Sequence, residues 1–270
     1  RSGLEEQIVK LSTLKVDLED SKALAEKKRR ELSTLKADLV AQQRVLDANR
    51  SQKQALLKET QNTEANYQRI LDEKRALAEA FEAELNALEN ELRITIDPNS
   101  LPKYGKGILS WPLDKVHITQ YFGTTPFSTA NPQVYSGKGH NGIDLRASVG
   151  TRIRASLAGV VKGTGDTDLT CRGASYGKWV LIEHDNGLST LYAHLSYIQV
   201  ARGERVATGQ TIGLSGNTGY STGPHLHFTV YATQGVQIRE FPSKASACRG
   251  KIYVMPVADP KAYLNPLSYL

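Results

Sequence analysis

The chain has 270 residues and a formal net charge of +6 at pH 7, and it exceeds the ~100–200 residues of a typical domain, so we expect two unequal parts. Its Lys and Arg residues are scattered among Asp and Glu rather than gathered in a run with interleaved aromatic residues, which argues against nucleic acid as a partner. The sequence holds no apolar run of about 18 residues, so we expect no membrane-spanning helix.

The first predicted part, residues 1–97, is a coiled coil. Between Leu4 and Ile96 the sequence contains no Gly or Pro, and most of its residues are strong helix formers. Apolar residues recur every seven positions from Leu4 to Leu46, and a second row runs from Leu71 to Leu92. Heptads sustained over this length are typical of a coiled coil, whose apolar stripe needs a partner helix.

The polar stretch 47–54 is the weakest part of this heptad pattern. Either the helix folds back there as a hairpin, or it continues and pairs with another chain. We expect one continuous helix, because the seven-residue spacing keeps its phase across the stretch and a loop would have no reason to preserve it. The helical part is then either a spacer or a lever that docks to a regulator.

A linker over residues 98–107 follows, because Pro98 and Pro102 end the helix. From residue 108 to residue 270 the pattern changes to short apolar runs separated by Gly. The clearest runs are HITQYF from His117, KWVLIEH from Lys178, LSTLYAHL from Leu188 and HLHFTVY from His225. The sequence Asp-Asn-Gly at 185–187 predicts a hairpin between two of them. We therefore expect a mainly β domain, built as an antiparallel sheet or sandwich.

The two cysteines, Cys171 and Cys248, have polar, Gly-rich or basic neighbours. A free structural cysteine is usually surrounded by apolar residues, so a disulfide between the two fits better than a pair of unlinked surface thiols. A disulfide in turn points to an oxidising, extracytoplasmic location.

Four of the six histidines fall in three short segments: GHNGID with His140 and Asp144, LYAHL with His194, and GPHLHF with His225 and His227. On a strand, His225 and His227 project from the same face, although a lone His-x-His pair is more often ordinary surface or core. Asn141-Gly142 supplies the turn that His140 and Asp144 need to approach one another. Three protein ligands with an open fourth position are the pattern of catalytic zinc.

Two of the histidines carry no motif. His184 precedes the turn at 185–187, and we interpret it as a strand-end residue near solvent. The P-loop motif GxxxxGK[ST] of many nucleotide-binding proteins does not occur in the sequence.

These segments, in this order, resemble the lysostaphin-type zinc endopeptidases that cut peptide cross-links of bacterial peptidoglycan. The resemblance runs from about Pro112 to Leu270 and includes ITQYFG and GQTIGLSGNTGYSTGPHLHF. It implies that His140, Asp144 and His227 bind a zinc ion (Zn2+), and that His194 and His225 are the catalytic histidines. Family members often carry an acidic residue directly after His-x-His-Phe, where this chain has Thr229.

The resemblance therefore predicts a long α-helical coiled coil followed by a mainly β zinc metallopeptidase domain that hydrolyses peptidoglycan. The alternative is a non-enzymatic activator of other cell-wall hydrolases, which some relatives with a coiled coil and degenerate metal ligands become. Because every expected ligand is present here, we expect catalysis. The architecture resembles division-associated wall hydrolase factors, so we also expect the helical part to bind a membrane ABC-transporter-like regulator or to self-associate, and to hold the enzyme inhibited.

Overall fold

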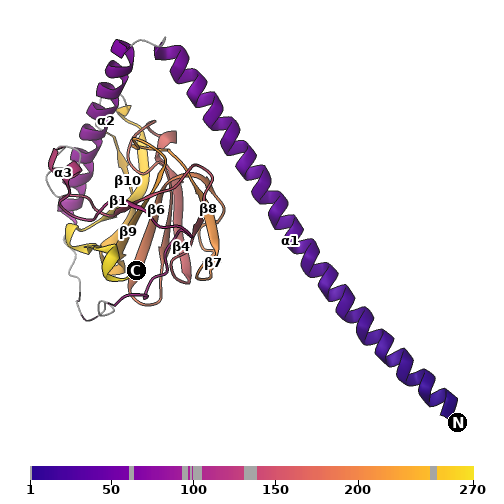
Figure 1. Ribbon diagram of the computed structural model, residues 1–270. Coiled ribbons are helices and arrows are strands. Elements are labelled where there is room, and N and C mark those ends of the chain that lie inside the picture. The colour runs from indigo at the N-terminus through magenta and orange to yellow at the C-terminus, as the bar shows by residue number, and fades with distance from the viewer. Residues whose placement is uncertain are drawn as a thin grey trace. The chain divides into compact units, whose positions relative to one another are not determined.

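The computed structural model describes residues 2–60, 64–92, 97, 99, 105–130, 139–243 and 248–270. The chain forms two compact units, Arg1–Ser51 and Gln52–Leu270. The helices are α1 (Ser2–Thr60), α2 (Glu64–Glu91) and α3 (Pro126–Ala130), with 3-10 turns η3 (Thr167–Leu169), η4 (Thr233–Gly235), η6 (Pro260–Ala262) and η7 (Pro266–Ser268). The strands are β1 (Ile118–Gln120), β2 (Ile143–Arg146), β3 (Arg152–Arg154), β4 (Gly159–Asp166), β5 (Lys178–Glu183), β6 (Leu188–Ile198), β7 (Arg205–Val206), β8 (Thr211–Ser215), β9 (His225–Ala232), β10 (Val236–Pro242), β11 (Ile252–Ala258) and β12 (Tyr263–Leu264), as labelled in part in Figure 1.

Helix α1 carries the N-terminal heptads without interruption through residues 47–54, so a hairpin at that stretch is wrong. Residues 61–63, between α1 and α2, lie outside the described residues, as does most of the predicted linker 98–107. The leucines at 11, 18, 32, 39 and 46 are 59–73% exposed. Their pairing with a partner helix stays a prediction. Among the described residues, no helix combines the length and apolarity that crossing a bilayer requires.

The second unit is built on one large antiparallel sheet with the strand order β1-β2-β9-β6-β5-β4-β7, which β3, β8 and β12 extend. Strands β5 and β6 pair directly across the predicted Asp-Asn-Gly turn, where Gly187 adopts a φ of +81° that favours glycine. Strands β10 and β11 form a separate hairpin. This confirms the prediction of a long helix followed by a mainly β, antiparallel domain.

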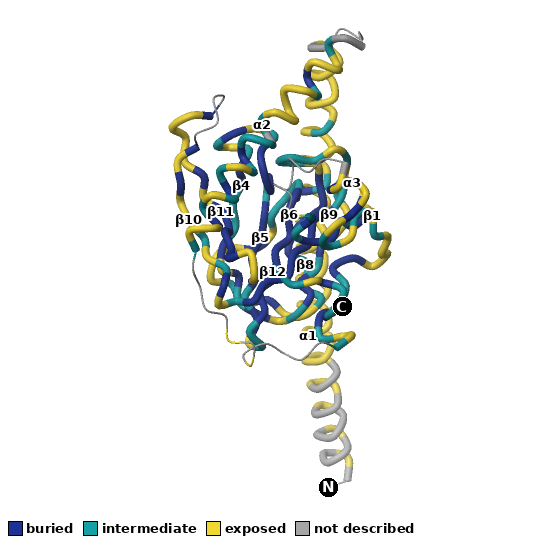
Figure 2. Tube along the Cα trace, turned by 90° about the vertical axis from the view of Figure 1, so that its left-hand side faces the viewer, coloured by how far each residue is buried: buried dark blue, intermediate teal, exposed yellow. Residues whose placement is uncertain are grey.

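Both faces of the central strands β5, β6 and β9 are buried, as their mostly dark blue colour in Figure 2 shows. On β5, Val180 and Ile182 belong to one hydrophobic core, whereas Trp179 and Leu181 belong to a second. Alternate residues of a strand face opposite sides of the sheet, so the two cores lie on its two faces. The continuous apolar run of the β5 sequence follows from this double burial.

Helix α2 packs on the second core. The ring of Phe81 lies edge-to-face against that of Tyr253 on β11, with centroids 4.9 Å apart, and Leu85 is also buried there. One helical turn further, the hydroxyl of Tyr263 on β12 donates a hydrogen bond to the carboxylate of Glu89. Helix α2 thus covers the sheet face toward which Trp179 and Leu181 point.

The expectation for His184 is wrong, because its side chain is 3% exposed. Its Nδ1 lies 3.0 Å from the carbonyl of Ala158, and its Nε2 lies 2.9 Å from Thr190 Oγ1. A Cβ at Gly159 would come within 2.9 Å of the ring, so this glycine permits the close packing. The histidine precedes a turn, as predicted, but it is covered by the neighbouring strand end.

Candidate active site

The site is assembled where β2 and β9 lie side by side. In their register Asp144 stands directly opposite His227, and cross-strand partners project from the same face. His225 lies two residues before His227 on β9 and shares that face. His140 precedes β2 and is fixed by two backbone hydrogen bonds of 2.8 Å with Gly123. The turn between His140 and Asp144 then brings both side chains to the His227 ring.

Three ligand atoms converge within this group, as the metal-binding geometry of His140, Asp144 and His227 shows. His140 Nε2 lies 3.1 Å from His227 Nδ1 and 3.3 Å from Asp144 Oδ1, and His227 Nδ1 lies 2.9 Å from Asp144 Oδ1. A tetrahedral ion with bonds of 2.0–2.2 Å separates its ligands by about 3.3–3.6 Å, so the three atoms lie close to the spacing that such an ion needs. The donor set and its spacing therefore fit a zinc ion.

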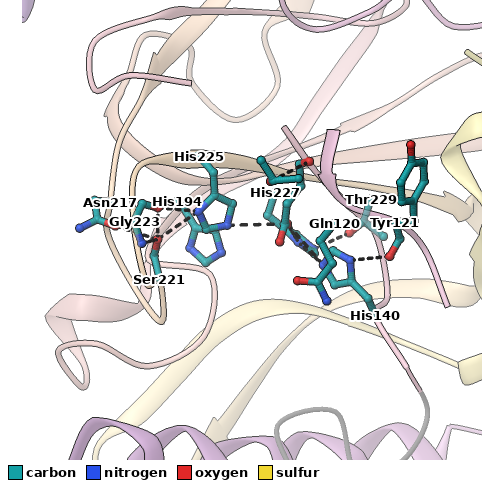
Figure 3. Close-up of polar contacts among 12 residues, drawn as sticks. Gln120, Tyr121, His140, His194, Asn217, Ser221, Gly223, His225, His227 and Thr229 are labelled. Atoms are coloured by element: carbon teal, nitrogen blue, oxygen red, sulfur yellow. Dashed lines mark hydrogen bonds and ion pairs between the residues drawn. The ribbon is translucent and has the colours of Figure 1, made fainter. Parts of the chain in front are cut away.

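Backbone carbonyls fix the protonated nitrogen in three of the four site histidines (Figure 3). The Nδ1–H of His140 donates to Tyr121 O at 3.0 Å, that of His194 to Thr218 O at 2.8 Å, and that of His225 to Gly223 O at 2.7 Å. A carbonyl only accepts hydrogen bonds, so Nδ1 carries the proton and the neutral rings present the Nε2 lone pair. In His140 that nitrogen is one of the three converging ligand atoms.

His194 reaches the site through an irregularity in β6. Its φ is +58°, and the pairing of β5 with β6 shifts register between Val180 and Lys178. Ala193 pairs with His227 across β6 and β9, so both residues face the same side of the sheet. In a regular strand, the side chain of the next residue, His194, would point to the opposite side. The positive φ at the bulge instead places its ring 4.7 Å from that of His225 and 5.8 Å from that of His227.

The charges at the site favour an ionised carboxylate beside neutral imidazoles. Burial acts to raise the pKa of Asp144, but hydrogen bonds from His140 and His227 and the charges of these rings hold that pKa well below its usual value. Burial, followed by repulsion from His225 and His227, lowers the pKa of His194 well below its usual value. Burial likewise lowers the pKa of His227 against the attraction of Asp144. The carboxylate oxygen of Asp144 and one nitrogen each of His140 and His227 thus converge on the candidate metal position.

The five side chains line one open groove, and all five residues that the sequence analysis singled out meet there. The groove also takes in residues that the sequence analysis did not assign to the site, namely Glu82 of α2, Thr119, Gln120, Asn141, Arg146, Ser175, Tyr176, and the segment from Tyr220 to Pro224. Sequence reasoning missed Tyr176, whose ring stacks 6.0 Å from that of His227. Burial raises the pKa of Tyr176, so its hydroxyl remains a hydrogen-bond donor. Its one sequence signal is an aromatic residue in a Gly-rich loop close to Cys171.

The disulfide joins Cys171 and Cys248, whose Cα atoms are 5.7 Å apart. It ties the β10–β11 hairpin to the loop after η3. In η3, directly before that loop, the carboxylate of Asp168 accepts hydrogen bonds from Gly173 N at 2.7 Å and from Gly219 N at 3.0 Å. The carbonyl of the preceding residue, Thr218, holds His194. The disulfide therefore braces the loop that orients a histidine of the groove.

Comparisons with known proteins agree with this geometry. A model of Peptidase family M23 matches residues 138–239. DD-carboxypeptidase/endopeptidase Mpg of Neisseria meningitidis is 43% identical over 117 residues, which are 43% of this chain and 25% of that protein. Peptidoglycan DD-endopeptidase ShyA of Vibrio cholerae is 48% identical over 90 residues, which are 33% of this chain and 19% of that protein.

Among solved structures, the catalytic domain of lysostaphin from Staphylococcus simulans is similar at 26% identity and a TM-score of 0.39, covering 56% of this chain and 89% of that one. The chain spans a quarter or less of the length of the two curated relatives. The family match falls on the part of the chain that carries His140, Asp144, His194, His225 and His227. This chain therefore carries a metallopeptidase domain of Peptidase family M23, which confirms its resemblance to the lysostaphin-type endopeptidases.

Proposed function

We propose that this protein is a zinc-dependent endopeptidase that hydrolyses peptide cross-links of bacterial peptidoglycan outside the cytoplasm. The observation that carries the proposal is the convergence of His140 Nε2, Asp144 Oδ1 and His227 Nδ1, all within 3.3 Å of one another, in a groove that also holds His194 and His225. The names of the relatives, a DD-carboxypeptidase/endopeptidase and a peptidoglycan DD-endopeptidase, support the substrate class.

The chain's own residues supply the proton transfers that amide hydrolysis needs. A zinc ion held by the three ligands would polarise the scissile carbonyl and lower the pKa of the attacking water. His194 and His225 lie next to the ligands, and the Nδ1–H of each ring donates to a backbone carbonyl. The Nε2 lone pair of each neutral ring can therefore accept a proton. One imidazole accepts a proton from water, and an imidazolium returns a proton to the leaving amine. Two adjacent rings divide this work.

The groove walls provide for an extended peptide. Gln120, Asn141 and Arg146 bring amide and guanidinium groups to the groove, and such groups match the carbonyls and carboxylates of a cross-link peptide. Tyr176 adds a hydroxyl that stays protonated.

We also propose that the helical part controls this activity. Helix α2 places Glu82 in the groove wall, one residue after Phe81, which anchors the helix on the second core. Movement of α2 would therefore change the shape and charge of the groove. The exposed leucines of α1 are suited to a helical partner, either a second copy of this chain or a membrane ABC-transporter-like regulator.

The function is tested with purified peptidoglycan. The zinc-loaded chain is incubated with intact sacculi, and the released fragments are identified by mass spectrometry. We expect new amino termini within the cross-link peptides, and no release after removal of zinc by a chelator. A chain that binds zinc but releases nothing by itself, and increases release by an added wall hydrolase, would instead indicate an activator.

A further inference from the structure

The two histidine ligands are used in opposite ways. His140 directs Nε2 to the ligand cluster, and the carbonyl of Tyr121 accepts the proton of its Nδ1 at 3.0 Å. His227 directs Nδ1 to the cluster, and its Nε2 lies 2.9 Å from the hydroxyl of Thr229. A carbonyl dictates the protonation of the ring that it contacts, whereas a hydroxyl can donate or accept.

Only one direction of the Thr229 hydrogen bond is compatible with metal binding. A neutral imidazole that offers the Nδ1 lone pair to a cation carries its proton on Nε2. The Thr229 hydroxyl then accepts that proton, because Oγ1 is its hydrogen-bond partner at 2.9 Å. If Nε2 lacked this acceptor, its N–H would be buried without a partner, which favours the other tautomer or a turned ring.

Threonine is held in place for this task. Strand β9 continues regularly past His227, so Thr229 projects from the same face, and its side chain is 0% exposed. Its β-branched side chain has few rotamers. Gly142, directly before β2, packs against this pair of residues, since a Cβ there would lie 2.7 Å from Thr229 Oγ1 and 2.9 Å from His227 Cε1. The hydroxyl is therefore held in a closely packed, buried position.

We propose that Thr229 is a positioning residue of the metal centre: its hydroxyl accepts the Nε2 proton of His227 and thereby presents Nδ1 as a zinc ligand. The proposal rests on the proposed zinc function of the site. Relatives of the lysostaphin type often carry an acidic residue at this position, one after Phe228, whereas this chain offers a neutral hydroxyl. The hydroxyl adds no charge to a site that already contains Asp144.

Two matched substitutions test the proposal through zinc affinity. Thr229→Val keeps the shape of the side chain and removes the hydroxyl, whereas Thr229→Ser keeps the hydroxyl and removes a methyl group. Competition with a chromophoric chelator should show an increase of about 10-fold or more in the zinc Kd of Thr229→Val, and a Kd close to that of the wild type for Thr229→Ser. Circular dichroism of the zinc-free proteins controls for folding. Equal zinc affinity of Thr229→Val and wild type overturns the proposal.

A second measurement needs no variant. Long-range proton–nitrogen NMR spectra of the zinc-loaded wild type should show a protonated Nε2 in His227 and a protonated Nδ1 in His140. A His227 ring protonated at Nδ1 would overturn the role of Thr229. Failure of the proposed function looks different, because the wild type itself would then bind no zinc in the chelator competition.

Discussion

The imidazole of His194 is the group whose loss should separate metal binding from catalysis. Its ring lies 4.7 Å from that of His225, but it contributes no atom to the three converging ligands. We expect His194→Ala to retain one zinc ion per chain while release of peptidoglycan fragments slows about 100-fold or more. Elemental analysis measures the metal, and mass spectrometry of the fragments measures the rate.

Two ligand variants are the controls for this experiment. His140→Ala and His227→Ala each remove one of the three ligand atoms, so both should lose zinc together with activity. If His194→Ala cleaved purified peptidoglycan at the rate of the wild type, the catalytic role of His194 would be wrong.

Acid should destabilise the zinc-free protein through His184, which lies outside the metal site. Burial lowers the pKa of His184 below its usual 6.5, against the carbonyl of Ala158 and the nearby carboxylates. The unfolded chain therefore takes up the proton at a higher pH than the folded chain does. Its contribution to the free energy of unfolding is complete above pH 6.5 and is lost as the pH falls toward the folded-state pKa.

Urea unfolding in the presence of a chelator measures this effect. The free energy of unfolding should drop between about pH 7.5 and about pH 5.5, and His184→Gln should reduce the drop. His117→Gln is the matched control, because His117 is exposed. An unchanged drop in His184→Gln would show that other groups account for the acid sensitivity.

The side of a strand toward which a single side chain points could be predicted from the sequence where the strand is regular. His225 and His227 meet because the period of a strand is two. The orientation of His194 was not predictable, since it depends on a positive φ at a bulge. The burial of His184 depends on Gly159, which is distant in sequence and leaves room for the ring. Contacts of this kind follow from tertiary packing and leave no periodic signal.

At the scale of elements, the Cys171–Cys248 disulfide should stabilise both the fold and the site. It links residues 77 positions apart, and removal of such a bond typically costs about 2–5 kcal/mol. Because the bridged loop also holds Gly219 through Asp168, we expect the Cys171→Ser/Cys248→Ser variant to melt at a lower temperature and to hydrolyse peptidoglycan more slowly. Calorimetry and fragment release measure the two effects.

Zinc content is the control for the disulfide variant. Neither cysteine belongs to the ligand cluster, so the variant should retain its zinc ion. Alkylation of two thiols in the native, unreduced protein would contradict the bridge itself.

Helix α2 should restrict the groove through Glu82. We expect Phe81→Ala, which removes the ring packed against Tyr253, to loosen α2 and to raise fragment release severalfold. Glu82→Ala, which keeps Phe81 and clears a side chain from the groove wall, should raise release as well. Limited proteolysis reports the loosening of the helix, and mass spectrometry reports the release.

The matched control on the other helix is Leu39→Ala, since Leu39 is 66% exposed and should affect neither measurement. If Phe81→Ala exposed α2 to proteolysis without any rise in fragment release, regulation by α2 would be wrong.

The elements differ in how far the sequence predicted them. Strands β5, β6 and β9 were predictable because apolar runs and an Asp-Asn-Gly turn mark them locally. The packing of α2 was not, because a heptad row identifies an apolar face and not its partner. Leu85, which belongs to the second heptad row, lies instead with Phe81 in the second core of the peptidase domain. The residues that receive them, such as Tyr253, are far away in sequence.

At the scale of the whole molecule, the same sheet serves the fold and the chemistry through the alternation of β9. Leu226, Phe228 and Val230 point into the first core, while His225 and His227 point to the groove on the other face. The second core continues beyond them on that face, where Tyr231 is buried. The site histidines therefore lie on a strand whose other residues are packed in a core. Such packing holds the ligand side chains in place.

The exposed stripe of α1 should make the protein associate with itself. A helix with sustained heptads typically buries its apolar stripe against a second helix, and Leu32 and Leu39 are each 66% exposed. We expect the sedimentation coefficient of the whole chain to rise with concentration, and the Leu32→Asp/Leu39→Asp variant to sediment as a monomer throughout. Leu169→Asp is the matched control, because Leu169 is 84% exposed but lies in the peptidase domain. A wild-type chain that stays monomeric at every concentration would leave a different protein as the partner of α1.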